Sequence, residues 1–210
     1  LTSAPADWVL IKTGVMVDLA AHPSDPALVH ASVEGDGVWR TANGTTTAGA
    51  AADWKKLDNG LPGNQTAMID IWSSTPNVLF AAVKTPLGGA GPLNPQPPLL
   101  GIYRSGDGGD SWGLLRFYGG AGNASLEGGL YNPFIRVHPS HPLIYFGGVK
   151  LYKWDVFWPF LPLAVQITGI HDDMKTLEFD PFDSSSYYIL NDGGIWRCRS
   201  VIGGADACVH

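Results

Sequence analysis

Charged residues are scarce in this chain of 210 residues. They make up 15% of it, lysine and arginine together number only 13, and the formal net charge is −6. A surface that binds nucleic acid or an anionic membrane is therefore not expected. The sequence also lacks an apolar run near the ~20 residues that a membrane-spanning helix needs. The nearest such run, residues 156–167, is interrupted by Pro159 and Pro162, so we predict no membrane insertion.

Cysteine and metal-binding spacings are also nearly absent. The only two cysteines, Cys198 and Cys208, have nine residues between them. This spacing suits a local disulfide between a strand and the segment that follows it, and two free thiols are the alternative. Neither a zinc-type Cys/His spacing nor an Asp-x-Asp-x-Asp calcium loop occurs. We expect no metal and no cofactor.

A signal peptide and an initiator methionine are missing, so Leu1 is interpreted as a processed or excised start. Three N-glycosylation sequons occur, where roughly one is expected by chance. They begin at Asn43, Asn64 and Asn123. The sequons favour an extracellular or secreted protein.

Turn-forming and strand-forming residues, in contrast, are abundant. The chain holds 27 glycines and 16 prolines among 45% hydrophobic and 11% aromatic residues. This composition predicts many short strands joined by turns and argues against long helices.

One pattern repeats four times along the chain. Each copy has an apolar strand, a turn, a second apolar strand, and a third strand of the type Gly-apolar-aromatic-basic, with lysine in place of the glycine in the third copy. The first strands begin 52, 66 and 42 residues apart, at Val17, Ile69, Ile135 and Leu177. Units of this size with several short strands are typical of propeller blades.

A distinctive turn follows the third strand of the second copy. Residues 105–112 fit the pattern Ser-x-Asp-x-Gly-x-Ser/Thr-Trp, the Asp box, at every defined position. We expect Asp107 to cap turn amides, Gly109 to adopt a positive φ, and Trp112 to fill the space between sheets. The defined positions, which we interpret as structural, are Ser105, Asp107, Gly109, Ser111 and Trp112.

With these features the chain resembles the BNR/Asp-box β-propeller superfamily, which includes sialidases, xyloglucan-cleaving endoglucanases and sortilin-type receptors. Residues 171–173, 177–182 and 191–197 are similar to a blade of its secreted glycosyl-hydrolase-like members. The resemblance covers nearly the whole chain at the level of repeats, although only one repeat has an intact Asp box. It implies an all-β propeller of four-stranded antiparallel blades in a single domain over residues 1–210. The blade repeats are expected at about residues 15–62, 66–117, 130–168 and 171–210.

The two ends of the chain suggest how the ring is completed. Residues 1–13 have the pattern of an outermost strand, and the last repeat reaches only its third strand before the chain ends. We expect the N-terminal strand to complete the last blade and close a four-bladed disc. The alternative is that the chain is part of a larger propeller, or assembles with another chain or with itself.

A polar residue follows the anchor of each first strand: Asp18, Asp70, Arg136 and Glu178. Repeat equivalence places these four residues at matching heights around the central axis. They could form a carboxylate-rich channel that binds a cation or a polar ligand. We favour the alternative, in which Arg136 pairs with Asp70 and Glu178, and we expect this pairing to lower the pKa of the carboxyl groups.

A second polar group surrounds the start of the last repeat and comprises His171, Asp172, Asp173 and Asp192. In a propeller, residues just before an innermost strand lie at the mouth of the channel. Inverting glycosidases use two carboxyl groups about 6.5–9.5 Å apart, and the resemblance to endoglucanases implies such a pair. The candidates are Asp172 or Asp173 facing Asp18. The alternative is that Asp172 caps a turn and His171 is solvated.

Sialidase chemistry needs three arginines that converge on a carboxylate. The chain has only six arginines, and Arg40, Arg104 and Arg197 occupy the repeated third strand. The sequence therefore excludes a sialidase.

Exposed aromatic residues are a further route to binding. Trp154 and Trp158 lie in a short aromatic segment between prolines and lysines. They are candidates for a sugar-stacking or partner-binding surface, with packing between blades as the alternative.

Two classes of function remain. We favour a non-catalytic propeller that acts as a binding or assembly module for a glycan or a protein partner. The alternative is a hydrolase, or a fragment of one, that cleaves a β-glucan by an inverting two-carboxylate mechanism.

Overall fold

A computed structural model describes residues 10–45, 53–84, 99–117, 134–156 and 164–210. The regular elements in these residues are sixteen β-strands, grouped into four antiparallel four-stranded sheets. None of these residues forms a helix that is long and apolar enough to cross a membrane.

Each sheet is built from four strands that are consecutive in sequence. Sheet 1 contains β1 (Met16–Ala21), β2 (Val29–Val33), β3 (Gly37–Thr41) and β4 (Lys55–Lys56). Sheet 2 contains β5 (Thr66–Ile71), β6 (Leu79–Lys84), β7 (Leu99–Ser105) and β8 (Gly113–Phe117). Sheet 3 contains β9 (Phe134–Val137), β10 (Leu143–Gly147), β11 (Leu151–Asp155) and β12 (Val165–Ile167). Sheet 4 contains β13 (Met174–Phe179), β14 (Ser186–Asn191), β15 (Gly194–Arg199) and β16 (Ala207–Val209).

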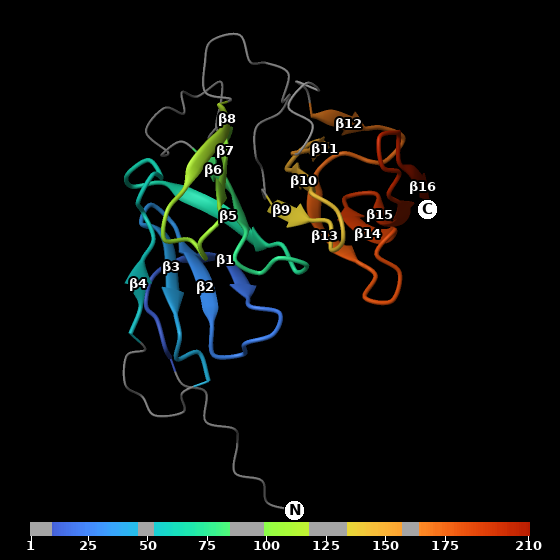
Figure 1. Cartoon of the computed structure of the whole chain (residues 1–210). Helices are drawn as coiled ribbons and strands as arrows, with labels where there is room; N and C mark the ends of the chain where they lie inside the picture. Colours follow the sequence, from blue (N-terminus) through green and yellow to red (C-terminus); the bar gives the residue numbers. More distant parts are fainter. Residues whose placement is uncertain (1–9, 46–52, 85–98, 118–133, 157–163) are drawn as a thin grey trace, which may run out of the picture.

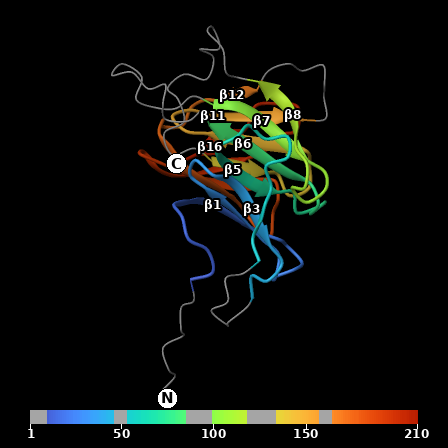
Figure 2. The ribbon, with the colours of Figure 1, turned by 90° about the vertical axis from the view of Figure 1, so that its left-hand side faces the viewer.

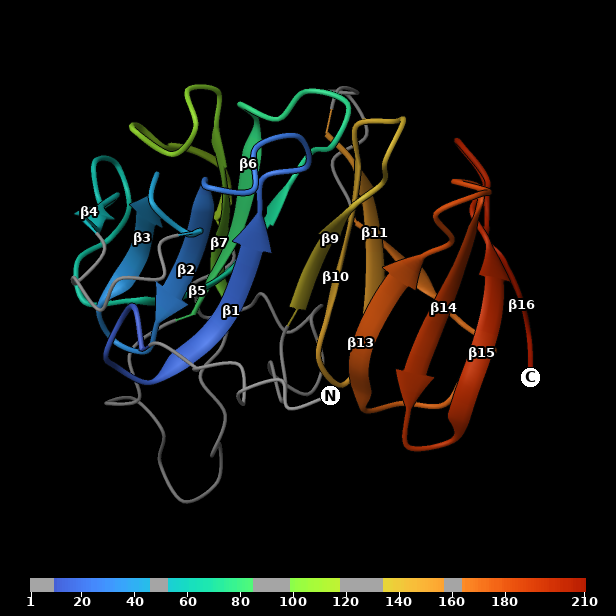
Figure 3. The same ribbon diagram turned by 90° about the horizontal axis from the view of Figure 1, so that it is seen from below.

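The sheets follow one another around a common axis, with the first strand of each innermost. β1 packs beside β5, β5 beside β9, and β9 beside β13. The result is an open arc, in which sheet 1 extends to one side and sheet 4 to the other (Figures 1 and 3). Seen from the sheet 1 end, sheet 1 lies below sheet 2 (Figure 2).

Three apolar clusters join consecutive sheets. Leu57, Ile69 and Leu79 belong to the cluster between sheets 1 and 2. Phe80 and Phe146, both fully buried, belong to the cluster between sheets 2 and 3, and further aromatic and aliphatic residues join sheets 3 and 4. Burial of each large side chain contributes roughly 1.5–3 kcal/mol, so these junctions hold the arc together. In the described ranges, no such cluster joins sheet 4 back to sheet 1.

The C-terminal segment supplies the fourth strand of sheet 4. The sequence assigned this place to residues 1–13, but β16 pairs with β15, and residues 10–13 form no strand. Residues 1–9 lie outside the described residues. Cys198 and Cys208 face each other across β15 and β16 and are joined by a disulfide. A three-residue strand is short, and the covalent link holds it in place.

The turn over residues 105–112 is organised by one carboxylate. Asp107 accepts hydrogen bonds from the Ser111 amide (2.9 Å), the Ser111 hydroxyl (2.5 Å) and the Ser105 hydroxyl (2.7 Å). These bonds, led by the one from the Ser111 hydroxyl, lower the pKa of Asp107 to about 2. Gly109 has a φ of 95°, and Trp112 is buried between sheets 1 and 2. Hydrogen bonds to Asp107 and the burial of Trp112 thus hold this turn against the neighbouring sheet.

A buried polar network joins sheets 3 and 4. The Lys153 ammonium on β11 lies 2.6 Å from an Asp206 oxygen and also donates to the carbonyls of Val201 and Gly204. The other Asp206 oxygen accepts from the Tyr145 and Tyr187 hydroxyls. The side-chain exposures of Lys153 and Asp206 are only 6% and 0%. Burial, followed by the negative charge of Asp206, raises the pKa of both phenols.

Candidate functional site

A pocket lies on the axis of the arc, at the ends of the innermost strands. Its volume is about 340 Å³, and all four sheets contribute to it. The lining consists of Leu19, Ala20, Ala21, Pro23, Asp70, Ile71, Ser73, Arg136, Val137, Glu178 and Phe179. The polar side chains are Asp70, Ser73, Arg136 and Glu178, and three of them come from the set that the repeat pattern placed around the axis.

Two of the axial carboxylates join neighbouring sheets through the backbone. Asp18 on β1 accepts a hydrogen bond from the Ile69 amide on β5 (2.8 Å), and Asp70 accepts one from the Val137 amide on β9 (2.7 Å). The second oxygen of each carboxylate accepts the amide of the following residue, Leu19 or Ile71. Each aspartate thus bridges its own innermost strand to the next.

Burial dominates the electrostatics of these aspartates. It raises the pKa of Asp18, and it raises the pKa of Asp70 to about 6, although the amide hydrogen bonds and the charge of Arg136 act in the opposite direction. The sequence-based expectation that pairing would lower these pKa values is therefore wrong. Desolvation of a carboxylate at the axis outweighs its favourable partners.

Arg136 and Glu178 form the more accessible half of the pocket. One guanidinium nitrogen of Arg136 lies 3.4 Å from a Glu178 carboxylate oxygen, and another donates to the Ile135 carbonyl (2.8 Å). The Glu178 side chain is 66% exposed and that of Arg136 is 23% exposed. Because this pair of opposite charges is in contact with solvent, a polar ligand can replace the contact between the two side chains at a modest cost in free energy.

The second predicted cluster lies at the other end of β13 from Glu178. Asp172 pairs with the Lys150 ammonium at 2.6 Å, and Asp192 pairs with Lys175 at 2.8 Å. Asp173 has a φ of 61°, and its amide donates to the Val149 carbonyl. Residues 171–173 are not part of the lining of the axial pocket. No carboxylate of this turn therefore faces Asp70 across the pocket.

His171 belongs to the same turn. Its ring nitrogen Nδ1 lies 3.0 Å from the Asp172 carbonyl, and its own carbonyl accepts from the Asn191 side chain (2.8 Å). The ring is exposed. In the structure these residues shape and anchor a turn between sheets 3 and 4.

The remaining candidates fall in different places. Trp154 is partly buried and packs against the cluster between sheets 2 and 3. Asn43 and Asn64 are exposed in connections between strands, where an N-linked glycan can be accommodated. Trp158 and Asn123 lie outside the described residues.

Sequence reasoning missed Ser73 and Phe179 in the pocket and Asp206 between the sheets. Ser73 lies two residues beyond the end of β5, and Phe179 is the last residue of β13. Comparison of the ends of the innermost strands between repeats could therefore have identified both. Asp206 could have been found by comparing sheets 2 and 4. Asp110 stands three residues before Gly113, which pairs with Arg104. Asp206 likewise stands three residues before Val209, which pairs with Arg197.

Metal chemistry has no obvious donor set in the described ranges. No group of three or more His, Cys, Asp or Glu side chains there is arranged to hold a metal ion.

Comparisons with known proteins identify the fold. No protein-family model and no curated protein matches the sequence. A putative TolB from Agrobacterium tumefaciens is similar in structure, with a TM-score of 0.60 and 15% identity over 95% of this chain and 63% of that one. A GH74 xyloglucanase from Xanthomonas campestris has a TM-score of 0.51 and 14% identity over 91% of this chain and 29% of that one. A chain of the COPII outer coat vertex has a TM-score of 0.64 and 9% identity over 91% of this chain and 48% of that one.

These neighbours are β-propeller proteins. The fold of this chain is a β-propeller arrangement of four sheets. It spans less than two thirds of the length of each of these neighbours. Sequence identities this low support an assignment of the fold but not of the function, which has to be argued from the site.

Proposed function

We propose that this chain is a non-catalytic propeller module that binds a neutral, hydroxyl-rich ligand of the glycan class in the axial pocket. The observation that carries the proposal is the make-up of the pocket. The Arg136–Glu178 pair and the Ser73 hydroxyl offer donors and acceptors, and Leu19 and Phe179 add apolar surface. Its volume of about 340 Å³ lies within the ~300–1,000 Å³ of small-ligand sites.

The chemistry of a sugar ring suits this mixture. Hydroxyl groups accept hydrogen bonds from a guanidinium and donate them to a carboxylate, and such charge-assisted bonds are stronger than neutral ones. The C–H face of the ring packs on aromatic or aliphatic surface. A small net charge in the pocket favours a neutral ligand over an anion.

The geometry argues against catalysis by two carboxyl groups. Inverting hydrolysis needs one carboxyl group that gives a proton to the leaving oxygen and another that activates water. Both oxygens of Asp70 already accept backbone amides, and Glu178 is paired with Arg136. The carboxylates that line the pocket are thus committed to holding strands and balancing charge.

Isothermal titration calorimetry with xyloglucan oligosaccharides and related glucans tests the proposal. Arg136→Met and Glu178→Gln should each weaken binding by about tenfold or more, because each removes a charged hydrogen-bonding partner. Lys55→Met is the matched control, since Lys55 is 62% exposed and pairs with Asp110, away from the pocket lining. Absence of binding, or equal affinity in all variants, would contradict the proposal.

A hydrolase is the second candidate, and one observation favours it: the pKa of Asp70 is raised to about 6, a value suited to a general acid. Release of reducing ends from xyloglucan by the wild-type chain, abolished in Asp70→Asn, would establish this candidate. Binding without release of reducing ends would leave the non-catalytic module as the function.

We also propose that the protein works outside the reducing cytosol. The Cys198–Cys208 disulfide and the exposed sequons at Asn43 and Asn64 support this location. Expression through a eukaryotic secretory pathway should give a product whose electrophoretic mobility increases after deglycosylation. Asn43→Gln and Asn64→Gln should each remove one step of that shift.

A further inference from the structure

A basic residue on the third strand of one sheet reaches the turn before the outer strand of the next. Arg40 on β3 donates to the Gly108 carbonyl (2.8 Å) and pairs with Asp110 (3.0 Å) in sheet 2. Lys153 on β11 contacts two carbonyls and Asp206 in sheet 4 in the same manner. We call this contact the inter-sheet clamp: one basic residue holding carbonyl oxygens and a carboxylate of the following turn.

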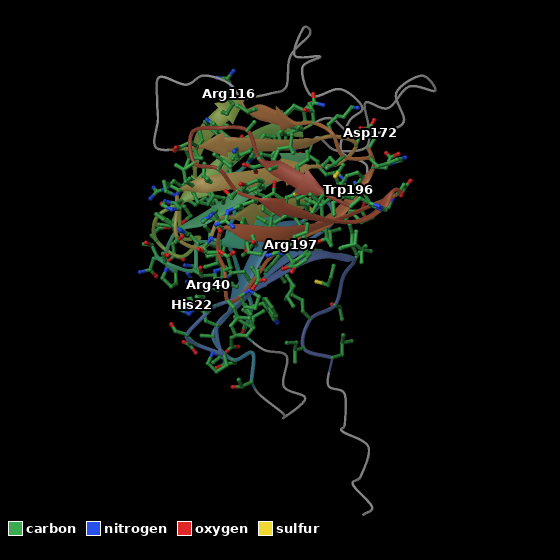
Figure 4. All side chains as sticks on the ribbon, turned by 90° about the vertical axis from the view of Figure 1, so that its right-hand side faces the viewer. His22, Arg40, Arg116, Asp172, Trp196 and Arg197 are labelled. Carbon is green, nitrogen blue, oxygen red and sulfur yellow. A yellow bond between two sulfur atoms is a disulfide. The ribbon has the colours of Figure 1, made fainter. Side chains whose placement is uncertain are left out.

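Each end of the arc presents one half of this clamp. Arg197 on β15 faces Tyr188 on β14, in the register in which Lys153 faces Tyr145 and Arg40 faces His30. It points away from sheet 3, is exposed, and its hydrogen bond to protein is a long one of 3.4 Å to the Ser186 hydroxyl. Figure 4, viewed from the sheet 4 end, labels it on that sheet.

The complementary half lies on sheet 1. Asp53 precedes β4 by two residues and is exposed, and it makes no ion pair with the described part of the chain. Asp110 precedes β8 by three residues, and Asp206 precedes β16 by one. Arg197 and Asp53 thus lie near the positions of the basic and acidic halves of the clamp, at opposite ends of the arc.

Apolar side chains are exposed on the sheet faces beside these two residues. On sheet 4, Tyr188, Leu190, Ile195 and Val209 are 36%, 38%, 62% and 65% exposed. The inward faces of the same strands are buried against sheet 3.

Sheet 1 presents a similar surface. Val15, Met16 and Leu19 are 62%, 42% and 66% exposed. Residues near Ile11 lie on this side, since the Trp54 indole donates to the Ile11 carbonyl (2.8 Å), and Leu10 there is 74% exposed. Apolar surface gathered on two sheet faces is what a protein interface buries.

A third feature at the sheet 4 end fits the same pattern. Asp18 and Asp70 each accept an amide of the next innermost strand, whereas Glu178, at the equivalent position on β13, is 66% exposed. Its repeat position is that of a carboxylate with a further strand beside it.

We propose that a second copy of this chain docks its sheet 1 against sheet 4, so that Arg197 of one copy clamps Asp53 of the other. Applied twice, this head-to-tail contact closes two open arcs into one ring with no free sheet face. A second copy is the occupant that the structure supports, because the chain itself carries both the basic and the acidic half of the clamp and an apolar face beside each.

Sedimentation velocity of the full chain over a range of micromolar concentrations tests this proposal. The expected species has twice the 22.4 kDa of one chain. Arg197→Asp and Asp53→Arg should each weaken association by about tenfold or more, because each places like charges together in a desolvated contact. The double variant Arg197→Asp/Asp53→Arg restores opposite charges and should restore association.

Glu34→Arg is the matched control. Glu34 is an exposed carboxylate of sheet 1, in the β2–β3 turn, which lies at the other end of β3 from Asp53. Association should be unchanged in this variant. A monomer at every concentration would overturn the proposal, as would a dimer indifferent to both single variants or one that the double variant fails to restore. Circular dichroism verifies that each variant is folded, and glycan binding in the pocket is measured separately, so the two proposals can fail independently.

Discussion

Removal of the negative charge of Asp206 should strongly destabilise the protein. The variant Asp206→Asn keeps the size of the side chain but leaves the Lys153 ammonium, whose side chain is 6% exposed, without a counter-charge. Two carbonyls, those of Val201 and Gly204, remain as its partners. These neutral acceptors do not offset the desolvation of a full positive charge.

The magnitude follows from the geometry. At 2.6 Å the Coulomb energy of the pair is about 6 kcal/mol for an effective dielectric constant of ~20, before desolvation is subtracted. Breaking a buried ion pair by removing one partner costs ~3–5 kcal/mol. For a domain of this size each kcal/mol lowers the melting temperature by ~2–4 °C, so the expected fall is roughly 6–20 °C.

Urea unfolding followed by tryptophan fluorescence measures the loss, and the chain supplies a matched control. Asp110 makes the same clamp with Arg40, but the two side chains are 43% and 21% exposed. Asp110→Asn should therefore cost less than about 1 kcal/mol. The double variant Lys153→Met/Asp206→Asn should recover much of the loss, because no charge stays buried alone. Similar losses for Asp206→Asn and Asp110→Asn would refute the reasoning that burial decides the strength of the clamp.

Four further perturbations test other parts of the structure. Cys208→Ala opens a loop with a sequence separation of 10 and should cost about 2.7 kcal/mol on the chain-entropy model, seen in urea unfolding and as faster proteolysis after residue 200. Burial, followed by the charge of a neighbouring histidine, lowers the pKa of His138 from 6.5 to about 4. Because the unfolded chain then binds the proton at a higher pH than the folded chain, stability should fall as pH drops from 6.5 to 4. The dependence of stability on pH should be shallower in His138→Gln. Asp70 has the opposite effect, because burial raises its pKa to about 6 in the folded chain. Its contribution to the free energy of unfolding should decline as pH rises from 3.8 to 6, and Asp70→Asn should remove that decline. Asp107→Ala removes the acceptor of three turn hydrogen bonds and should lower the unfolding free energy by about 1 kcal/mol without affecting glycan binding.

Much of the fold could be predicted because the repeated strands have a strong local signature. The Gly-apolar-aromatic-basic segments form the third strands β3, β7 and β15, and the lysine-led variant forms β11. In the last repeat, Asn191 and Gly194 flank the turn between β14 and β15, where Asn191 accepts the Gly193 amide and Gly194 has a φ of 115°. Local chemistry of this kind needs no knowledge of distant contacts.

The electrostatics of the site could not be predicted in the same way. The repeat placed Asp18 and Asp70 at the axis, but the direction of their pKa shifts depends on how completely the surrounding sheets exclude water. Asp206 was overlooked because its partner, Lys153, is 53 residues away in sequence. The strand at 207–209 was missed for a related reason: three residues carry little pattern, and its position depends on a disulfide.

Among the described strands, the main contacts of each sheet are with its neighbours in sequence, and this has a consequence for how the molecule unfolds. In the described residues, apolar clusters lie on both faces of sheets 2 and 3 but on one face of sheets 1 and 4. The packing that holds a sheet in place is therefore strongest in the middle of the arc. A linear array of this type is described by unit stabilities and nearest-neighbour couplings, and it frays from its ends. Amide hydrogens of β5, β6, β9 and β10 should therefore exchange most slowly, and those of the terminal units should exchange first, unless a covering surface removes the distinction between terminus and interior.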